Sequence, residues 1–547
     1  MKLLEKEPDL YDSEFQKIFP ESVEIYESLL NTIGKKGKVL EIGSGTGKLA
    51  IQLNKLGLEV IAVDSSKDMI EFASKQVQSN DADVKFFKGD FTSHFIYQQL
   101  ETEGPFDFII STFVLSELTP FKQLLFLKQI YNLLSPKGQF FIAAEIILKN
   151  RTSKLFYKLK QSLFNQINIF REGYTTYPVL DFNEKLENWF YSNLLLERRN
   201  IQLYTGTKKD IEDRISSLPT LESQLGRFRW IKVLYCILNG ILTRKSIKPG
   251  LYIVGNPNER SPLLVTSNYY WTVSAVSNAL KNSQIDCYVL ITDTNGINVW
   301  CAAGGGYFTH QSIIDALRLF DVDKYLTHKD IIIPQLAATG VDRKEITKFN
   351  WEPKFGPINI NEIQKYLVKG QKFPSQSKIG FNIVTRTIMG AQHTIFLSIA
   401  YFLPILLLSG ILGVLGLDQS FFWFNIIFQG SIIGVILSQV FAWIYPIFNY
   451  TRSFFIKGLI FGMISSTGII LILINLQTPF NISTIIFWFL LILLISLLVS
   501  LDFAGHTPYS NHLEVEADLV LFLFPAILII ASLIVILLLF PPVELLF

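Results

Sequence analysis

Five long runs of uncharged, mostly apolar residues fill the C-terminal part of this 547-residue chain. Between positions 394 and 501 only Asp418, Arg452 and Lys457 carry a charge. Each run is close to the roughly 20 residues with which a helix crosses the hydrocarbon core of a bilayer. We therefore predict an all-α transmembrane domain with five helices, in which the third helix begins before Lys457 and that lysine snorkels outward. The domain covers residues 390–547, and its runs are 394–416, 422–448, 458–474, 482–501 and 519–540.

Lysine and arginine side chains flank some of these runs and not others. Lys378 and Arg386 precede the first run, whereas the loops after the first and third runs contain neither residue type. Basic residues favour the cytoplasmic side of a membrane. We therefore predict a multi-pass protein of the cytoplasmic (inner) membrane, embedded in the lipid bilayer, with its soluble domains facing the cytoplasm. The central part of each run has no charge, which disfavours an ion path.

Two counts exclude further classes of protein. The formal net charge is +2, which gives no reason to expect nucleic acid as a partner. Three cysteines are too few for a disulfide scaffold or a self-contained four-cysteine iron–sulfur cluster. They are Cys236, Cys287 and Cys301.

A glycine-rich turn near the N-terminus indicates a nucleotide site. Residues 38–50 are typical of a strand, a turn with Gly43, Gly45 and Gly47, and a helix. Glycines permit positive φ and a close approach of backbone to ligand. A second apolar strand, 57–64, ends in Asp64, about 20 residues past the glycines, where a carboxylate can bind ribose hydroxyls.

The same pattern continues through predicted strands at 84–90, 106–114 and 133–142. Together these motifs resemble the class I S-adenosylmethionine-dependent methyltransferases over about residues 36–150, and they fit an NAD-binding protein less well. The resemblance implies an α/β Rossmann-like domain over residues 1–220 with S-adenosyl-L-methionine as cofactor. It places Glu41 and the three glycines beside the methionine moiety, Asp64 at the ribose, Asp90 and Phe91 at the adenine, and Ser111 and Thr112 near the methyl donor.

Residues 284–301 contain the second informative stretch. Asn295-Gly296 between apolar runs predicts a hairpin, and Cys301 then ends a strand before a helix at about 309–319. A cysteine beside a helical or glycine-rich turn can have a lowered pKa and act as a thiolate. Without such a context a cysteine is more often a small buried hydrophobe, which is what we expect of Cys236 and Cys287.

The segment 298–304, Asn-Val-Trp-Cys-Ala-Ala-Gly, resembles the cap-helix motif of the mercury-methylating corrinoid proteins. The similarity covers about residues 225–547, although Gly305 stands where that family has lysine. It implies an α/β Rossmann-like corrinoid-binding domain over 225–375, with a cobalamin-type corrinoid and with Cys301 as catalytic residue and lower axial ligand to cobalt. The corrinoid contacts that it implies are Asn298, Val299, Trp300, Ala302, Ala303 and Gly304.

Together the two resemblances imply a membrane-anchored corrinoid-dependent methyltransferase. The methyl group would move from S-adenosylmethionine to a cysteine-ligated cobalt corrinoid and on to a soft metal or metalloid acceptor, such as Hg(II), to give methylmercury. Reduced cobalt needs a strong reductant, so a ferredoxin-like reductase partner is expected. Two alternatives stay open: a methyltransferase for a lipid or quinone, with the C-terminal half as a membrane anchor, and a non-enzymatic corrinoid-carrying membrane module.

Overall fold

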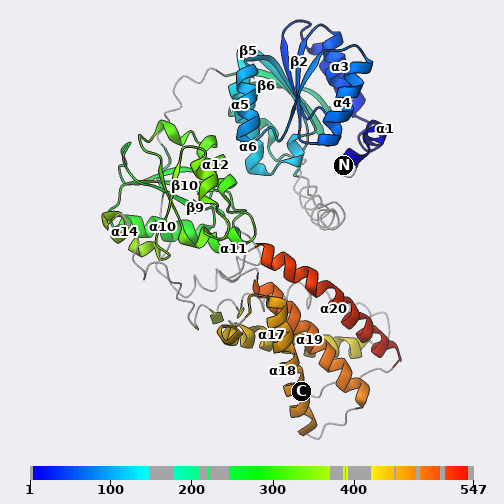
Figure 1. Ribbon diagram of the computed structural model, residues 1–547, viewed down its shortest axis with the longest axis vertical. Helices are drawn as coiled ribbons and strands as arrows, with labels where there is room; N and C mark the ends of the chain where they lie inside the picture. The colour runs from blue at the N-terminus through cyan, green and yellow to red at the C-terminus, as the bar shows by residue number, and fades with distance from the viewer. Residues whose placement is uncertain are drawn as a thin grey trace. The chain divides into compact units, whose positions relative to one another are not determined.

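The computed structural model divides into two compact units, Met1–Ser216 and Ser217–Phe547 (Figure 1). The predicted domain limits 1–220, 225–375 and 390–547 stay predictions. The transmembrane run 394–416 and Cys236 lie outside the described residues. The structure describes residues 4–146, 177–209, 218–221, 246–369, 383, 386–387, 390–391, 420–448, 451–475, 481–504 and 512–539.

The first unit is built on a 7-stranded sheet in the order β3-β2-β1-β4-β5-β7-β6. Strands β1 to β5 are parallel, and β7 runs antiparallel to both of its neighbours. This arrangement confirms the predicted Rossmann-like fold. The strands are β1 Lys38–Ile42, β2 Glu59–Asp64, β3 Val84–Lys88, β4 Phe106–Thr112, β5 Leu134–Glu145, β6 Phe190–Arg198 and β7 Ile201–Lys208.

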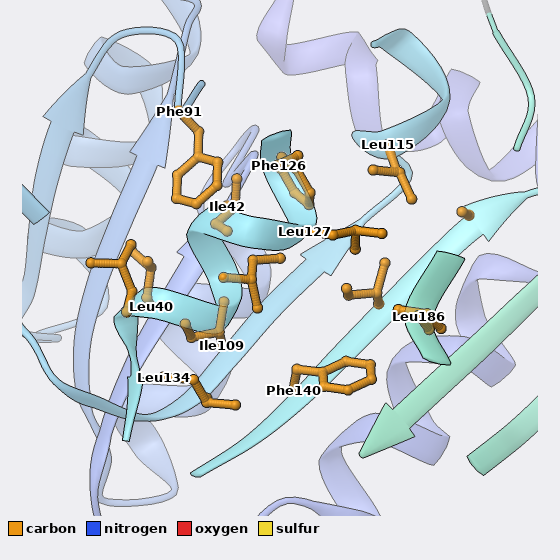
Figure 2. Packing of buried hydrophobic residues seen from close by; sticks show 14 of the residues in the cluster. Leu40, Ile42, Phe91, Ile109, Leu115, Phe126, Leu127, Leu134, Phe140 and Leu186 are labelled. Carbon is orange, nitrogen blue, oxygen red and sulfur yellow. The ribbon is translucent and has the colours of Figure 1, made fainter. Parts of the chain in front are cut away.

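Both faces of this sheet are buried because its central strands are apolar on both sides. Val39 packs in one core, whereas Leu40 and Ile42 lie in the opposite core together with Phe91 and Phe126 (Figure 2). The helices are η1 Leu4–Lys6, α1 Pro8–Ile18, α2 Ser22–Thr32, α3 Lys48–Lys55, α4 Lys67–Ser79, α5 His94–Glu103, η2 Leu115–Glu117, α6 Pro120–Leu133 and α8 Phe182–Glu187.

The second unit begins with a 5-stranded sheet in the order β12-β11-β9-β10-β8. Its strands are parallel except β8, which runs antiparallel to β10. The strands are β8 Gly250–Val254, β9 Leu263–Ser267, β10 Cys287–Thr292, β11 Asp330–Ile333 and β12 Glu352–Phe355. The helices are α10 Tyr270–Asn282, α11 Val299–Gly304, α12 His310–Leu319, η3 Val322–Lys324, η4 Gln335–Ala337, α13 Arg343–Thr347, η5 Ile360–Glu362 and α14 Ile363–Lys369.

The hairpin predicted at Asn295-Gly296 is wrong, although the turn itself forms. Both residues have positive φ, 57° and 68°, and the Ile297 N–H donates to the Thr294 carbonyl, as in a type I′ turn. The chain leaving this turn enters helix α11 and not a strand. Cys301 therefore lies in a helix at the end of the sheet, and α12 follows close to the predicted range.

Apolar helices make up the last part of the chain. Among the described residues, three are long and apolar enough to cross a membrane: Phe454–Ile472, Ile482–Leu501 and Ala517–Ile536. A shorter apolar stretch, Phe428–Ile444, lies in α17, and the total of five spans stays a prediction. The helices are α17 Ser420–Ile444, η8 Tyr445–Phe448, α18 Phe454–Asn475, α19 Ile482–Ala504 and α20 His512–Leu539.

Helix α18 begins before Lys457, as predicted, but this lysine does not snorkel outward. It is 3% exposed, and its ammonium lies 4.1 Å from the ring centre of Phe454 and 4.8 Å from that of Tyr445. Asp518 of α20 caps the same helix end, because its carboxylate accepts hydrogen bonds from the Ser453 hydroxyl (2.5 Å) and the Phe454 N–H (2.6 Å). The polar groups at this helix end are thus satisfied inside the protein.

Candidate functional site

A cavity of about 690 Å³ lies at the carboxyl ends of β1, β2 and β4. This is the edge at which open parallel sheets bind their ligands. Ser111 is fully buried and is not among the lining residues, and Gly47 is also absent from the wall. The predicted residues that line the cavity are Glu41, Gly43, Gly45, Asp64, Asp90, Phe91 and Thr112. Their roles in binding stay predictions.

The three positions of the turn require glycine for different structural reasons. All have positive φ, from 51° to 79°. A Cβ at Gly43 would lie 2.1 Å from Val114 Cγ2, and one at Gly47 would lie 2.9 Å from Ala73 Cβ. A Cβ at Gly45 would meet no atom of the described residues within 4 Å. Gly43 and Gly47 therefore serve packing, whereas Gly45 leaves open space at the cavity wall.

Asp64 holds this turn in place. Its Oδ2 accepts a hydrogen bond from the Gly45 N–H and its Oδ1 one from the Ser66 N–H, both at 2.8 Å. A carboxylate has about four acceptor positions, so these bonds leave capacity for ribose hydroxyls. Burial raises the pKa of this carboxyl, although the backbone hydrogen bonds oppose the shift.

Glu41 at the end of β1 is a buried acid on the cavity wall. It is 3% exposed, and its Oε2 accepts no hydrogen bond from any described residue. Burial and the nearby charge of Asp64 raise the pKa of Glu41 well above its ordinary value. A buried acceptor without a partner is costly, so a ligand that brings positive charge or donors to this position would stabilise it.

Asp90 and Phe91 follow β3. Although burial raises the pKa of Asp90, the Lys122 ammonium at 3.2 Å and hydrogen bonds from Thr92 outweigh it, and the net pKa is lowered. Asp90 is thus ionised at neutral pH. Phe91 is 5% exposed and packs edge-on against Phe126 at 5.0 Å, so most of its ring belongs to the core and only part of it reaches the cavity (Figure 2).

Helix α1 supplies a wall that the sequence analysis missed. Phe15 and Phe19 contact the ring of Phe113, at 5.1 and 5.5 Å, and Phe113 has a φ of 66° directly after β4. The Thr46 hydroxyl donates to Asp12 Oδ1 (3.0 Å), which joins α1 to the glycine turn. The amphipathic pattern of residues 8–18 was the available signal.

The charge of the cavity wall fits a cation. Its two basic residues are Lys48 and Lys122. S-adenosylmethionine carries an ammonium and a sulfonium against one carboxylate, so the excess of acids on this wall, with the unpartnered Oε2 of Glu41, suits it. The acids are Glu5, Asp12, Glu27, Glu41, Asp64, Asp90, Glu117 and Glu145.

Cys301 lies in the first turn of α11, in the second unit. Asn298 caps this helix, because its Oδ1 accepts a hydrogen bond from the Cys301 N–H at 3.0 Å. Cys301 is partly exposed, as are the predicted contacts Asn298, Trp300 and Gly304. The remaining three predicted contacts are buried in the domain and seat the helix; they are Val299, Ala302 and Ala303.

The thiol of Cys301 is not activated in the protein alone. Burial raises its pKa to about 11, against the opposing effect of hydrogen bonds with Asn298 and Trp300. The position beside a helix start and a glycine-rich turn therefore does not lower the pKa of this thiol in the metal-free chain, and the role of Cys301 as a cobalt ligand stays a prediction. A coordinated metal ion replaces the thiol proton, so this value does not prevent ligation. Cys287 is fully buried, which confirms its prediction as a structural cysteine.

The surroundings of α11 bear on whether a large polar cofactor fits. The helix packs against η4 and the end of β9. A Cβ at Gly340 would lie 2.7 Å from the Ala303 carbonyl oxygen, so only glycine allows this approach. The buried hydroxyls of Thr266 and Ser267 have no hydrogen-bond partner among the described residues. A partly exposed cysteine on α11 and unsatisfied hydroxyls at the end of β9, both at the carboxyl edge of a Rossmann-like sheet, fit a metal-centred macrocycle with polar substituents.

Comparisons with known proteins divide the chain in the same way. Residues 39–138 match a family described as "Methyltransferase domain". Residues 236–367 match a family described as "CO dehydrogenase/acetyl-CoA synthase delta subunit". The glycine turn, the sheet order and the first match identify the first unit as an S-adenosylmethionine-dependent methyltransferase, and the protein is therefore an enzyme.

Curated relatives match only a short part of the chain. The gamma subunit of the acetyl-CoA decarbonylase/synthase complex from Methanopyrus kandleri is 31% identical over 135 residues, which is 24% of this chain and 29% of the relative. The gamma 2 subunit from Methanosarcina thermophila is 41% identical over 98 residues, 18% and 21% of the two chains. The chain thus spans less than a third of the length of these relatives.

Solved structures resemble the chain more distantly. The magnesium protoporphyrin IX methyltransferase of Synechocystis PCC 6803 is 17% identical with a TM-score of 0.27, and the match covers 34% of this chain and 83% of that one. A score of this size leaves the fold assignment to the sheet topology described above. The comparisons point to the acetyl-CoA synthase relatives and do not single out the mercury-methylating proteins.

Proposed function

We propose that this chain moves a methyl group from S-adenosylmethionine to a cobalt corrinoid held by its own second unit, and on to a soft metal or metalloid acceptor. The observation that carries the proposal is the presence, in one chain, of a methyltransferase cavity and of a partly exposed cysteine at the carboxyl edge of a second Rossmann-like sheet. The match to subunits of acetyl-CoA decarbonylase/synthase supports the second half.

In the first unit, the glycine turn and the acidic wall bind the donor. Asp64 fixes the Gly45 backbone and offers its remaining lone pairs to the ribose. Glu41 faces the positive end of the donor with its unpartnered oxygen. Such orientation supplies most of the rate of methyl transfer from a sulfonium, whose carbon is already electrophilic.

In the second unit, α11 would hold the corrinoid through the Cys301 sulfur. When bound, the corrinoid would supply a reduced cobalt able to take the methyl group from the sulfonium, with S-adenosylhomocysteine as the other product, and to pass it to a soft electrophile such as Hg(II). A thiolate ligand donates more charge than imidazole and suits this transfer. Asn298 caps the helix and thereby holds the backbone of Cys301.

Two partners complete the proposal. Formation of Co(I) needs an external electron donor, which we propose to be a ferredoxin-like protein. The apolar helices, three of which within the described residues are long enough to cross a bilayer, would anchor the chain in the cytoplasmic membrane.

The test is transfer of label within the purified full-length protein. The protein is prepared anaerobically with hydroxocobalamin in detergent and is then given a low-potential reductant and methyl-labelled S-adenosylmethionine. We expect label on the bound corrinoid, and no label with Asp64→Ala, which removes the donor site. Cys301→Ala should abolish the cobalt–thiolate absorption band and reduce transfer from the corrinoid to Hg(II).

The same experiment separates the alternatives. A protein that binds S-adenosylmethionine but no cobalt would favour methylation of a lipid or quinone. A protein that binds corrinoid but shows no donor binding would favour a carrier module. Label that stays on the donor in a cobalt-loaded, reduced sample would refute the proposal.

A further inference from the structure

A buried asparagine, Asn268, lies between the end of β9 and the loop that leads to Cys301. It follows β9 directly and is 3% exposed. Its Oδ1 accepts hydrogen bonds from the backbone N–H groups of Thr294 (3.0 Å) and Gly296 (2.9 Å). Its Nδ2 donates to Asp293 Oδ1 at 2.9 Å. One side chain therefore binds three successive parts of the loop after β10.

The hydrogen-bond partners fix the orientation of the Asn268 amide. Two backbone N–H groups can only donate, so the atom facing them must be the oxygen, and the carboxylate of Asp293 can only accept, so it faces the nitrogen. The Thr294 hydroxyl lies 2.8 Å from Asn268 Oδ1 and 2.8 Å from the Ile297 carbonyl oxygen. Its single proton serves one of these acceptors at a time.

The loop passes this constraint on to the helix. Asp293 Oδ1 also accepts from the Asn295 N–H at 3.0 Å, which holds the left-handed turn at Asn295 and Gly296. Two residues later Asn298 begins α11 and caps the Cys301 N–H. Because α11 is short and starts directly after this loop, the loop helps to fix the backbone of its first turn.

We propose that Asn268 is a positioning residue that sets where the Cys301 sulfur lies, through the loop 293–297. The inference rests on the proposed role of Cys301 as a cobalt ligand, but its geometry belongs to the chain alone. The hydrogen bonds of Asn268 described above go to the loop and not to Cys301 itself. It acts by fixing the backbone from which α11 starts.

A charge swap tests this idea with matched variants. Asn268→Asp keeps an oxygen for the two backbone N–H groups but places a second carboxylate beside Asp293. Asn268→Asp combined with Asp293→Asn restores one donor and one acceptor between residues 268 and 293, but the new amide nitrogen cannot accept from the Asn295 N–H, so this swap recovers only one of the two bonds of Asp293 Oδ1. Asn258→Ala is the control, because Asn258 Oδ1 accepts from the Arg260 N–H in an exposed loop elsewhere in the domain.

Two readouts are measured on the full-length protein. In the corrinoid-free protein, alkylation of Cys301 by iodoacetamide is followed by peptide mass spectrometry. We expect Asn268→Asp to accelerate it roughly tenfold, because the loop opens more often, and the swap to slow it again in part, because the bond from the Asn295 N–H stays lost. With hydroxocobalamin bound, Asn268→Asp should weaken the cobalt–thiolate band at unchanged cobalt content, and the swap should recover part of it.

The outcomes separate the two proposals. Unchanged alkylation in Asn268→Asp, or a swap variant no slower than Asn268→Asp, would overturn the positioning role. A wild-type protein without any cobalt–thiolate band would overturn the proposed function. The alkylation rates would still test whether Asn268 positions Cys301. Equal acceleration by Asn258→Ala would assign the effect to general destabilisation and also overturn the inference.

Discussion

Replacement of Gly45 by alanine should separate ligand binding from folding more cleanly than any other change in the glycine turn. The new Cβ would meet no described atom within 4 Å and would stand at the wall of the cavity. The left-handed backbone, with a φ of 51°, costs an L-residue roughly 1–2 kcal/mol. If the ligand packs against the bare Gly45 backbone, an inserted methyl costs roughly 1–3 kcal/mol of binding. This corresponds to about 5- to 160-fold weaker affinity.

Two other glycines provide the comparison. Gly57→Ala has the same kind of strain, with a φ of 92°, but its Cβ lies 3.4 Å from the Lys35 carbonyl oxygen, away from the cavity. Gly43→Ala adds a contact of 2.1 Å with Val114 and should lose roughly 2–5 kcal/mol of stability.

The assay is calorimetric titration with S-adenosylhomocysteine on the full-length protein, with hydrogen exchange of peptides from β1 and β4 as the measure of stability. Gly45→Ala should bind S-adenosylhomocysteine weakly, and its hydrogen-exchange rates should equal those of Gly57→Ala. Gly57→Ala should bind like the wild type. Normal affinity in Gly45→Ala would refute the assignment of this turn as the donor site, and faster exchange than in Gly43→Ala would refute the steric argument.

Three further predictions follow from single contacts. Because burial and Asp64 raise the pKa of Glu41, its contribution to the free energy of unfolding is full below the ordinary glutamate pKa and declines as the pH rises above that value. Binding of cationic S-adenosylmethionine should release a proton, seen by calorimetry in buffers of different ionisation enthalpy. Glu41→Gln should weaken both effects, and the raised pKa of Asp64 accounts for what remains. Gly305→Lys places a positive charge at an exposed position with a φ of −90°, and it should lower the pKa of the Cys301 thiol below about 11. The alkylation of Cys301 should then rise at a lower pH than in the wild type. An unchanged pH profile would show that the new ammonium lies too far from the thiol. Asp518→Asn should weaken the cap of α18 and lower the stability of the helical region by about 1–3 kcal/mol. The measurement is thermal unfolding in detergent, followed by circular dichroism. Ser532→Ala, at an exposed position, is the control and should leave the stability unchanged.

The first unit was largely predictable because its signals are local and repeated. Strands β1, β2, β4 and β5 are apolar runs whose last residue lies in the cavity wall, as Asp64 does at the end of β2. What could not be predicted is which groups pair across the fold. The bond from Gly45 to Asp64 and the packing of α1 on Phe113 depend on tertiary contacts that no local pattern contains.

The second unit shows how a correct local signal can give a wrong element. Asn295-Gly296 forms the expected left-handed turn, but whether a strand or a helix follows depends on the next partner. Here Asn298 caps Cys301 and starts a helix, while Asn268 occupies the groups that a returning strand would have used. Likewise the raised pKa of Cys301 follows from burial, which a sequence does not report.

The contact between Gly340 and Ala303 has a mechanical consequence. Gly340 follows η4, and its backbone approaches that of Ala303 too closely for any Cβ, so this segment and α11 cannot slide past each other without a steric clash. A displacement of Cys301 would therefore be passed to the segment after β11 as well as to the turn after β10.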